Sequence, residues 1–67
     1  MQLIPKIREK RMEAHLTQVQ LAQKLNISKS HLSLIESGKH YPAIPLVFRI
    51  AKACSCKVDD LYAISEE

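Results

Sequence analysis

The 67-residue sequence has little of what phosphate-binding enzymes and membrane proteins require. Its single glycine excludes a glycine-rich loop that cradles phosphate. No apolar run approaches the length that crosses a bilayer, and the N-terminus lacks the continuous apolar core of a signal peptide. No motif arranges a nucleophile, a base and an orienting group. We therefore expect a cytoplasmic protein that is not an enzyme and contacts no membrane.

Side chains that bind metals or form disulfides are also few. Cys54 and Cys56 are separated by one residue, a spacing that rarely forms a disulfide, and His15, His31 and His40 lack the spacing of metal ligands. We expect no metal and no cofactor, with both cysteines reduced and serving as small buried hydrophobic residues. A redox role is the alternative, which would require exposed thiols of low pKa.

The composition favours a small helical protein with a positive field. Apolar residues make up 46% of the chain, with only three aromatic residues and three prolines, which is typical of a small helical globule. A chain this short allows one domain, which we expect to span residues 1–67. The net charge is +3, and residues 1–42 contain seven basic side chains against three acidic ones. A positive field of this kind fits a nucleic-acid-binding protein.

Residues 16–38 carry the most informative pattern. Two apolar runs at helical spacing are separated by the short turn Asn26-Ile27-Ser28. Thr17 and Ser28 stand just before the two runs, where a hydroxyl accepts a bond from an unpaired amide and starts a helix. Gly38 ends the second run, because glycine enters the left-handed cap conformation without steric cost. The pattern predicts a helix-turn-helix.

This stretch resembles the helix-turn-helix family of phage Cro and repressor proteins, also called the XRE family. Asn26 stands where the family usually has glycine, but asparagine tolerates the left-handed conformation better than most residues. The resemblance implies an all-α, compact five-helix domain like that of lambda repressor, with the helix-turn-helix at helices 2 and 3. The positions that match the family pattern are Leu16, Thr17, Gln18, Leu21, Ala22, Ser28, Ile35, Glu36 and Gly38.

The apolar periodicity predicts helices over residues 5–14, 18–25, 29–37, 43–53 and 58–64. Leu3, Ile4, Ile7, Arg11 and Ala14 trace one apolar helical face that continues from the residues before the first helix, and Leu61 is expected to close the core. Arg11 on that face points inward, where a guanidinium requires a carboxylate.

Glu36 is the expected partner of Arg11, because the resemblance implies a largely buried ion pair at these two positions. The alternative is that each side chain is separately solvated. Lone buried charges are strongly disfavoured, which favours the pair.

The helix predicted over residues 29–37 is the candidate recognition helix. If Leu32 and Ile35 face the core, four side chains project outward as candidate base readers: Lys29, Ser30, Ser33 and Leu34. Lys29 would donate to guanine or contact only phosphate, and Leu34 would pack on a thymine methyl or be an ordinary surface leucine. Phosphate contacts are expected from Gln18 in the first turn of the preceding helix and from the loop residues Lys39, His40 and Tyr41.

The expected partner is double-stranded DNA, bound sequence-specifically by a homodimeric transcriptional repressor on a palindromic operator. Tyr62 and Ile64 leave apolar surface at the C-terminal end, which predicts a dimer interface there, with fraying of the terminus as the alternative. The alternative function is an antitoxin or another protein-interaction module on the same fold. A different protein would then cover Tyr62 and Ile64.

Overall fold

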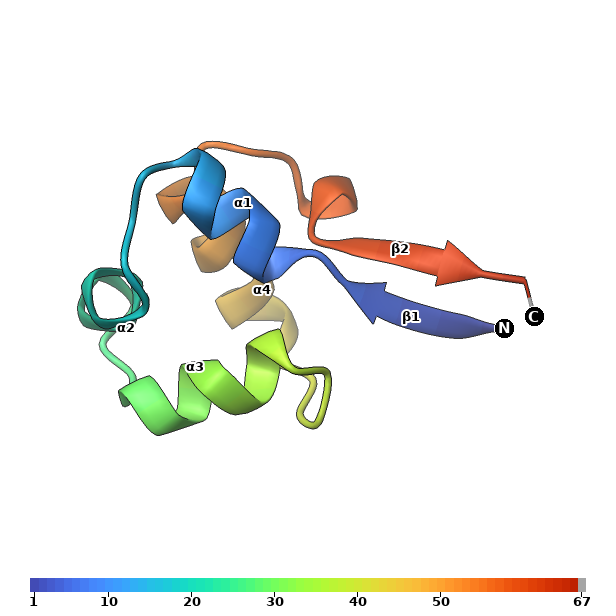
Figure 1. The fold of residues 1–67 in the computed structure, drawn as a ribbon, viewed down its shortest axis with the longest axis horizontal. Helices are drawn as coiled ribbons and strands as arrows, with labels where there is room; N and C mark the ends of the chain where they lie inside the picture. The colour runs from blue at the N-terminus through green and yellow to red at the C-terminus, as the bar shows by residue number, and fades with distance from the viewer. Residues whose placement is uncertain (67) are drawn as a thin grey trace.

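The structure, a computed structural model that describes residues 1–66, joins a group of short helices to a two-stranded sheet (Figure 1). The sheet is antiparallel and projects from one end of the helical body. Within the described residues the elements are β1 (Gln2–Pro5), α1 (Ile7–Glu13), α2 (Gln18–Leu25), α3 (Lys29–Glu36), α4 (Ile44–Ala53), the 3-10 turn η1 (Val58–Asp60) and β2 (Tyr62–Ser65).

Helices α2 and α3 form the predicted helix-turn-helix. Thr17 accepts a hydrogen bond from the Gln20 N–H at 3.1 Å, and the Gln20 side chain accepts one from the Thr17 N–H at 2.8 Å, so α2 begins with a complete capping box. Ser28 caps α3 by accepting from the His31 N–H at 3.0 Å. Asn26 has φ 57°, which confirms the left-handed turn expected of it.

Gly38 ends α3 for two reasons. Its φ is 82°, and the N–H groups of Gly38 and Lys39 donate to the carbonyls of Ile35 and Leu34 at 3.2 and 3.0 Å, which is the Schellman arrangement. A Cβ at this position would lie 3.3 Å from Pro5 Cγ, closer than most real contacts of this kind. The loop after α3 therefore leaves in a direction that only glycine permits without strain.

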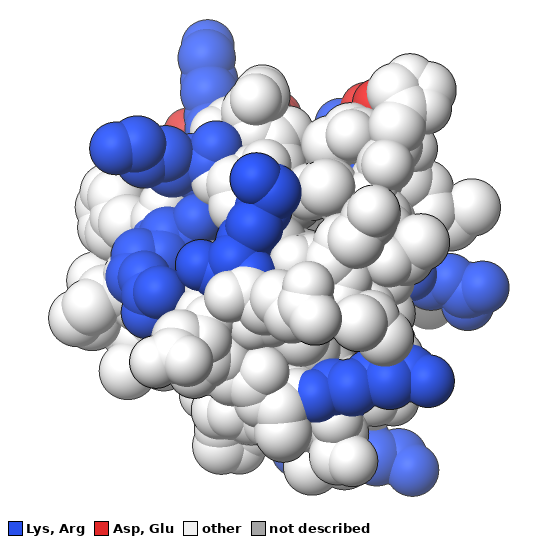
Figure 2. Space-filling view, turned by 90° about the vertical axis from the view of Figure 1, so that its left-hand side faces the viewer, with Lys and Arg blue, Asp and Glu red and all other residues white. Residues whose placement is uncertain are grey.

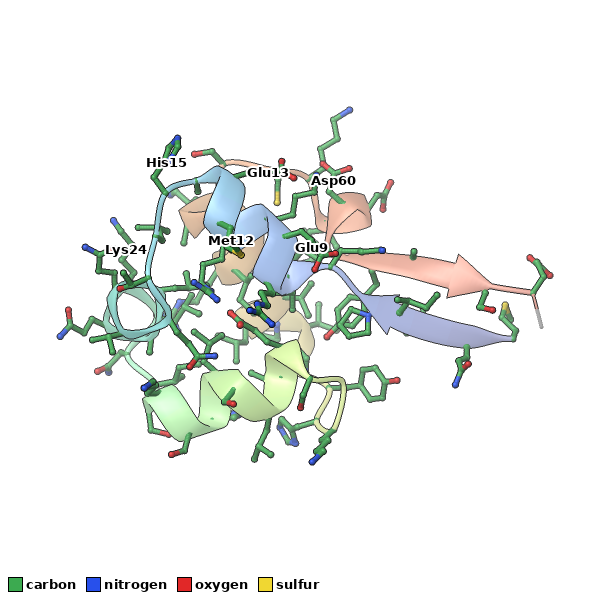
Figure 3. All side chains as sticks on the ribbon, viewed as in Figure 1. Glu9, Met12, Glu13, His15, Lys24 and Asp60 are labelled. Atoms are coloured by element: carbon green, nitrogen blue, oxygen red, sulfur yellow. The ribbon has the colours of Figure 1, made fainter. Side chains whose placement is uncertain are left out.

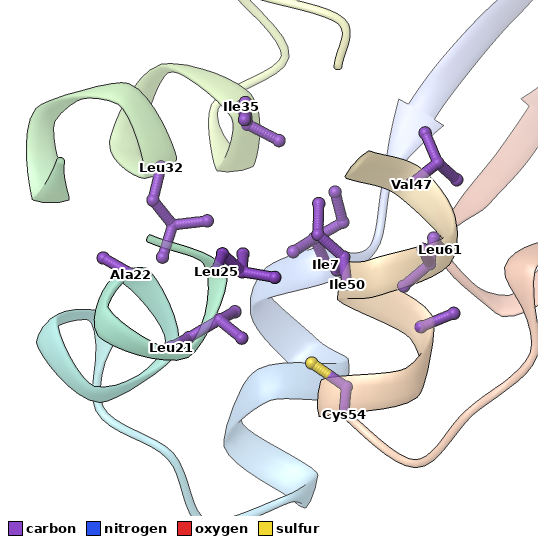
Figure 4. Packing of buried hydrophobic residues seen from close by; sticks show 11 residues of the cluster. Ile7, Leu21, Ala22, Leu25, Leu32, Ile35, Val47, Ile50, Cys54 and Leu61 are labelled. Carbon is purple, nitrogen blue, oxygen red and sulfur yellow. The ribbon is translucent and has the colours of Figure 1, made fainter. Parts of the chain in front are cut away.

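One apolar core lies between the helices and receives the end of η1 (Figure 4). Leu61 is fully buried, as predicted, while Cys54 is buried and Cys56 is half-buried. Burial raises the pKa of both thiols, which makes thiolate formation less favourable. The buried members are Ile7, Leu21, Ala22, Leu25, Leu32, Ile35, Val47, Ile50, Ala51, Cys54 and Leu61.

The helix predicted over residues 5–14 is confirmed over Ile7–Glu13, but the prediction for its start was wrong. Helix α1 begins at Ile7, not at residue 5, and Leu3 and Ile4 lie in β1 instead of on a helix. A proline disfavours the helical conformation in the residue before it, so Pro5 keeps Ile4 extended. The strand is completed by a partner from the other end of the chain, because Leu3 pairs with Ile64.

The prediction of a helix over residues 58–64 was also wrong. The chain forms a single 3-10 turn and then β2, in which tyrosine and isoleucine are favourable strand residues. The Lys6 N–H donates to the Leu61 carbonyl at 2.8 Å, which holds the two ends of the chain together beside the sheet. The predicted all-α, five-helix fold is therefore corrected to four α-helices, one 3-10 turn and a two-stranded sheet within residues 1–66.

Arg11 and Glu36 form the contact that joins α1 to α3. Arg11 Nε donates to Glu36 Oε2 at 2.7 Å and Nη2 donates to Oε1 at 3.3 Å, with the two side chains only 11% and 5% exposed. The third nitrogen, Nη1, donates to the Leu16 carbonyl at 2.9 Å, and Gln18 Nε2 donates to Glu36 Oε1 at 3.2 Å. The guanidinium and the carboxylate therefore connect α1, the start of α2 and α3.

Replacing Glu36 with alanine should destabilise the fold by roughly 3 to 5 kcal/mol, because Arg11 would keep a nearly buried charge without its partner. Urea unfolding followed by circular dichroism measures this loss. Since that cost approaches the whole stability of a domain this small, Glu36→Gln, which keeps the shape of the side chain, provides a milder variant with a smaller loss. The double variant Arg11→Met with Glu36→Leu should recover much of the stability. A Glu36→Ala protein as stable as the original would contradict this account of the pair.

Candidate nucleic-acid interface

Helix α3 has one buried face and one exposed face. Leu32 and Ile35 are fully buried, so the helix is held in a fixed rotation about its own axis. The four predicted base readers all lie on the exposed side, and Leu34 is 46% exposed although it is apolar. This exposed set comprises Lys29, Ser30, Ser33 and Leu34.

The loop after α3 folds back along the helix. The N–H groups of Lys39 and His40 both donate to the Leu34 carbonyl, at 3.0 and 3.3 Å. The ring of His40 meets the half-buried ring of His31 edge to face, with centroids 5.1 Å apart. Lys39 and His40, two of the predicted phosphate ligands, are therefore exposed beside α3.

Tyr41 lies nearer the sheet than the other predicted phosphate ligands. Its ring is 6.0 Å from the ring of Tyr62 on β2, and its side chain is exposed. Tyr62 is half-buried, its hydroxyl is buried without a hydrogen-bond partner, and burial raises the pKa of this phenol. Ile64, the other residue predicted for a dimer interface, is exposed. Tyr62 thus packs against the core of its own chain, whereas Ile64 is exposed to solvent.

A hollow of about 300 Å³ opens between α1, the start of α2 and α3. Sequence reasoning missed Arg8, which lies exposed at its wall. The available signal was spacing, because Arg8 precedes Arg11 by three residues and therefore lies on the same side of α1. The lining residues are Arg8, Arg11, Gln18, Ser33, Glu36 and Ser37. The hollow therefore combines a free guanidinium with the N-terminus of a helix.

Gln18, the remaining predicted phosphate ligand, is held in this hollow. Its side-chain amide is already engaged with Glu36, so its position is set by the ion pair. Its backbone N–H belongs to the first turn of α2, where amides have no partner within the helix and the helix dipole is positive. The start of α2 therefore offers an anion a backbone donor, with Arg8 close by.

Charge is distributed unevenly over the molecule. The end that carries α2 shows many basic side chains and almost no acidic ones (Figure 2). Glu9, Glu13 and Asp60 lie around α1 and η1, on the side of the molecule away from α3 (Figure 3). Glu36 is the acidic residue of α3, and Arg11 neutralises it. The surface around α3 and the start of α2 is therefore available to a polyanion.

No group of three or more histidine, cysteine, aspartate or glutamate side chains in residues 1–66 could hold a metal ion. No helix in the same range is long and apolar enough to cross a membrane.

Comparison with known proteins identifies the family. Residues 7–61 match the HTH_3 family, described as helix-turn-helix. An uncharacterized HTH-type transcriptional regulator of Methanocaldococcus jannaschii is 38% identical over 53 residues, covering 79% of this chain and 80% of that protein. The immunity repressor protein of Bacillus phage phi105 is 40% identical over 53 residues, covering 79% of this chain and 37% of the repressor.

A solved structure supports the fold. The crystal structure of a putative DNA-binding protein from Bacteroides fragilis superposes with a TM-score of 0.86 over 92% of this chain and 100% of that one, at 19% identity. At 19% identity the structural likeness shows that the two proteins share a fold. The family match over residues 7–61 is what shows common descent. The chain therefore belongs to the helix-turn-helix family of phage-repressor-like DNA-binding proteins, as the pattern in residues 16–38 predicts.

Proposed function

We propose that this protein is a sequence-specific transcriptional regulator, and more specifically a repressor that binds a palindromic operator as a two-fold dimer. The observation that carries the proposal is the exposed face of α3 beside the hollow that Arg8 lines. The Arg11–Glu36 ion pair and the buried side chains Leu32 and Ile35 hold α3 in this position. The names of the relatives support regulation of transcription, and the phage immunity repressor supports repression. Such a regulator acts in the cytoplasm, where the DNA is.

The exposed face of α3 enters the major groove in this proposal. The N-terminal residues of a recognition helix contact base edges, so Lys29 and Ser30 are placed to donate to guanine or to bond a base edge. Ser33 and Leu34 follow one turn later, where the Leu34 methyl groups would pack on a thymine methyl. The exposure of an apolar side chain at the centre of a polar face supports that role for Leu34.

Phosphate contacts flank the reading face. On one side of α3, the main-chain N–H of Gln18 and the Arg8 guanidinium bind a DNA phosphate at the hollow. On the other side, Lys39 and His40 in the loop after α3 bind phosphates of the DNA backbone. Tyr41 is the remaining proposed phosphate ligand of the loop, and its ring contacts the ring of Tyr62 on β2. Contacts on both sides of α3 would set its depth in the groove. Repression would follow from covering the site that polymerase needs.

Substitutions on the exposed face of α3 should change sequence preference and leave the fold intact. Ser30→Ala and Leu34→Ala truncate exposed side chains that are not members of the apolar core, so the free energy of unfolding should be nearly unchanged. Discrimination at one or two base pairs should fall by about 1 to 3 kcal/mol for each substitution. Selection from a random DNA pool, followed by fluorescence anisotropy on the enriched duplex, measures this.

The same titrations test the function itself. The unmodified protein should prefer the enriched duplex over a random one by a factor of about 10³ or more, and the enriched site should be a palindrome. Weak binding that is indifferent to sequence would contradict the proposed function. Base preferences that stay the same in both variants would contradict the assignment of Ser30 and Leu34.

Substitutions of the flanking cations should weaken binding to every sequence equally. Lys39→Ala and Arg8→Ala each remove one phosphate contact, so the slope of log affinity against log salt should fall by roughly one for each. Lys52→Ala is the matched control, because Lys52 is an exposed cation on α4 outside the proposed interface. Titrations at three salt concentrations separate the cases. A loss that depends on the DNA sequence, or an equal loss in the control, would refute these assignments.

A further inference from the structure

Two of the histidines meet at the edge of the exposed face of α3. The ring of His31, in the first turn of α3, meets the ring of His40 in the following loop, with centroids 5.1 Å apart and the ring planes inclined by 65°. His31 is half-buried and His40 is exposed. The His40 N–H donates to the Leu34 carbonyl at 3.3 Å, which fixes the main chain of the loop against the helix. An imidazole is therefore held beside the face that we propose enters the major groove.

Neither imidazole of this pair has an acidic partner in the protein. Glu36 is the only acidic side chain between residues 14 and 58, and two nitrogens of Arg11 already bind its carboxylate. Within residues 1–66 the ion pairs join lysine or arginine to glutamate, and neither histidine takes part in one. A proton on either ring therefore has no carboxylate to pair with in this part of the chain.

The elements around the pair contribute cations. Helix α1 adds Arg8 and Arg11, which line the hollow beside α3, and Tyr41 is the other titratable side chain of the loop. The remaining charged side chains of α2, α3, α4 and the loop, apart from Glu36, are Lys24, Lys29, Lys39, Arg49 and Lys52. An anion from outside the protein is therefore the partner that a protonated histidine would find here.

We infer that His40 binds one DNA phosphate in its protonated form and that His31 is the residue that positions it, an inference that rests on the proposed function. The helix dipole assigns the proton. His31 lies in the first turn of α3, where a positive charge is unfavourable, whereas His40 lies against a carbonyl of the last turn, where it is favourable. Two protonated rings at this distance would repel each other, so the pair holds one proton.

The role of His31 follows from its burial. Its half-buried ring is held by the fold, and an edge-to-face contact between two aromatic rings is favourable beyond the area that it buries. This contact limits the directions in which the exposed His40 side chain can point. His31 therefore acts through His40 and does not itself touch the phosphate.

Proton uptake makes the affinity for DNA depend on pH. Histidine is the side chain whose charge changes between about pH 5 and 8, whereas a lysine keeps its charge over this range. Lys39 therefore supplies a constant attraction to the DNA backbone, and His40 supplies one that appears as the pH falls. Because the complex takes up a proton that the free protein lacks at high pH, binding strengthens towards low pH.

Anisotropy titrations of a labelled duplex at about pH 5.5 and about pH 7.5 test this inference. The unmodified protein should bind about tenfold more tightly at the lower pH, within the limit of about 100-fold that uptake of one proton sets over two pH units. The slope of log affinity against log salt should also be steeper there by up to about one, because one more phosphate is neutralised. In His40→Asn both differences should nearly vanish.

The third histidine provides the matched control. His15 is exposed between α1 and α2, away from α3 (Figure 3). Its φ is 59°, a conformation that asparagine tolerates, so His15→Asn removes the same titrating group without strain. This control should keep the full response to pH. Circular dichroism at both pH values checks that each variant is folded.

Two substitutions of His31 separate positioning from titration. His31→Ala removes the ring, so the response to pH should become smaller. His31→Phe restores an aromatic ring without a titratable nitrogen, so it should restore the response. A response that His31→Ala leaves intact would overturn the positioning role, and a response that His31→Phe abolishes would overturn the assignment of the proton to His40.

The remaining outcomes distinguish this inference from the proposed function. An unmodified protein with equal affinity at both pH values, a response that persists in His40→Asn, or an equal loss in His15→Asn would each overturn the inference. Titration of an enriched and a random duplex at one pH tests the function separately, because the phosphate contact is the same in both. Sequence-specific binding without a response to pH keeps the function and overturns the inference. A response that depends on His40 but is indifferent to sequence supports the phosphate contact and contradicts the function.

Discussion

The ion pair between Arg11 and Glu36 is the contact on which the arrangement of this protein depends. Two nitrogens of the guanidinium bind the carboxylate, and the third binds the carbonyl of Leu16, just before α2 begins. The same carboxylate holds Gln18. One charged group therefore fixes the start of α2 against the end of α3, which are the two parts of the motif that we propose contact DNA together. Because both charges are nearly buried, neither can leave without stranding the other.

The helix-turn-helix could be predicted from the sequence because each of its signals is local. Thr17, Asn26, Ser28 and Gly38 begin or end helices through bonds to residues within a few positions, and the structure confirms each of these. The exposed side of α3 was also predictable, since helical periodicity places its side chains once the buried ones are known. The ion pair between residues 25 positions apart was predictable only through the family resemblance.

What could not be predicted depends on contacts between distant parts of the chain. Strand β1 exists because β2 pairs with it, and its apolar residues are equally compatible with a helix when considered alone. Arg49 gives a second case. Helical periodicity places Arg49 on the exposed side of α4 and gives no sign of a tertiary contact. In the structure its Nη2 donates to the Leu25 carbonyl at 2.9 Å, which caps the end of α2. The spacing of Arg8 from Arg11 places it on the same side of α1, but only the fold shows that residues of α2 and α3 form a hollow beside it.

The same chain separates two kinds of surface, and the separation follows from the fold. Charged residues gather around the helices, whereas the first strand, the last strand and the start of α4 contain none. Pairing of β1 with β2 places the two uncharged strands side by side at one end of the molecule (Figure 1). The chain of 67 residues therefore keeps the basic surface around α2 apart from the two strands, which carry no charged side chain.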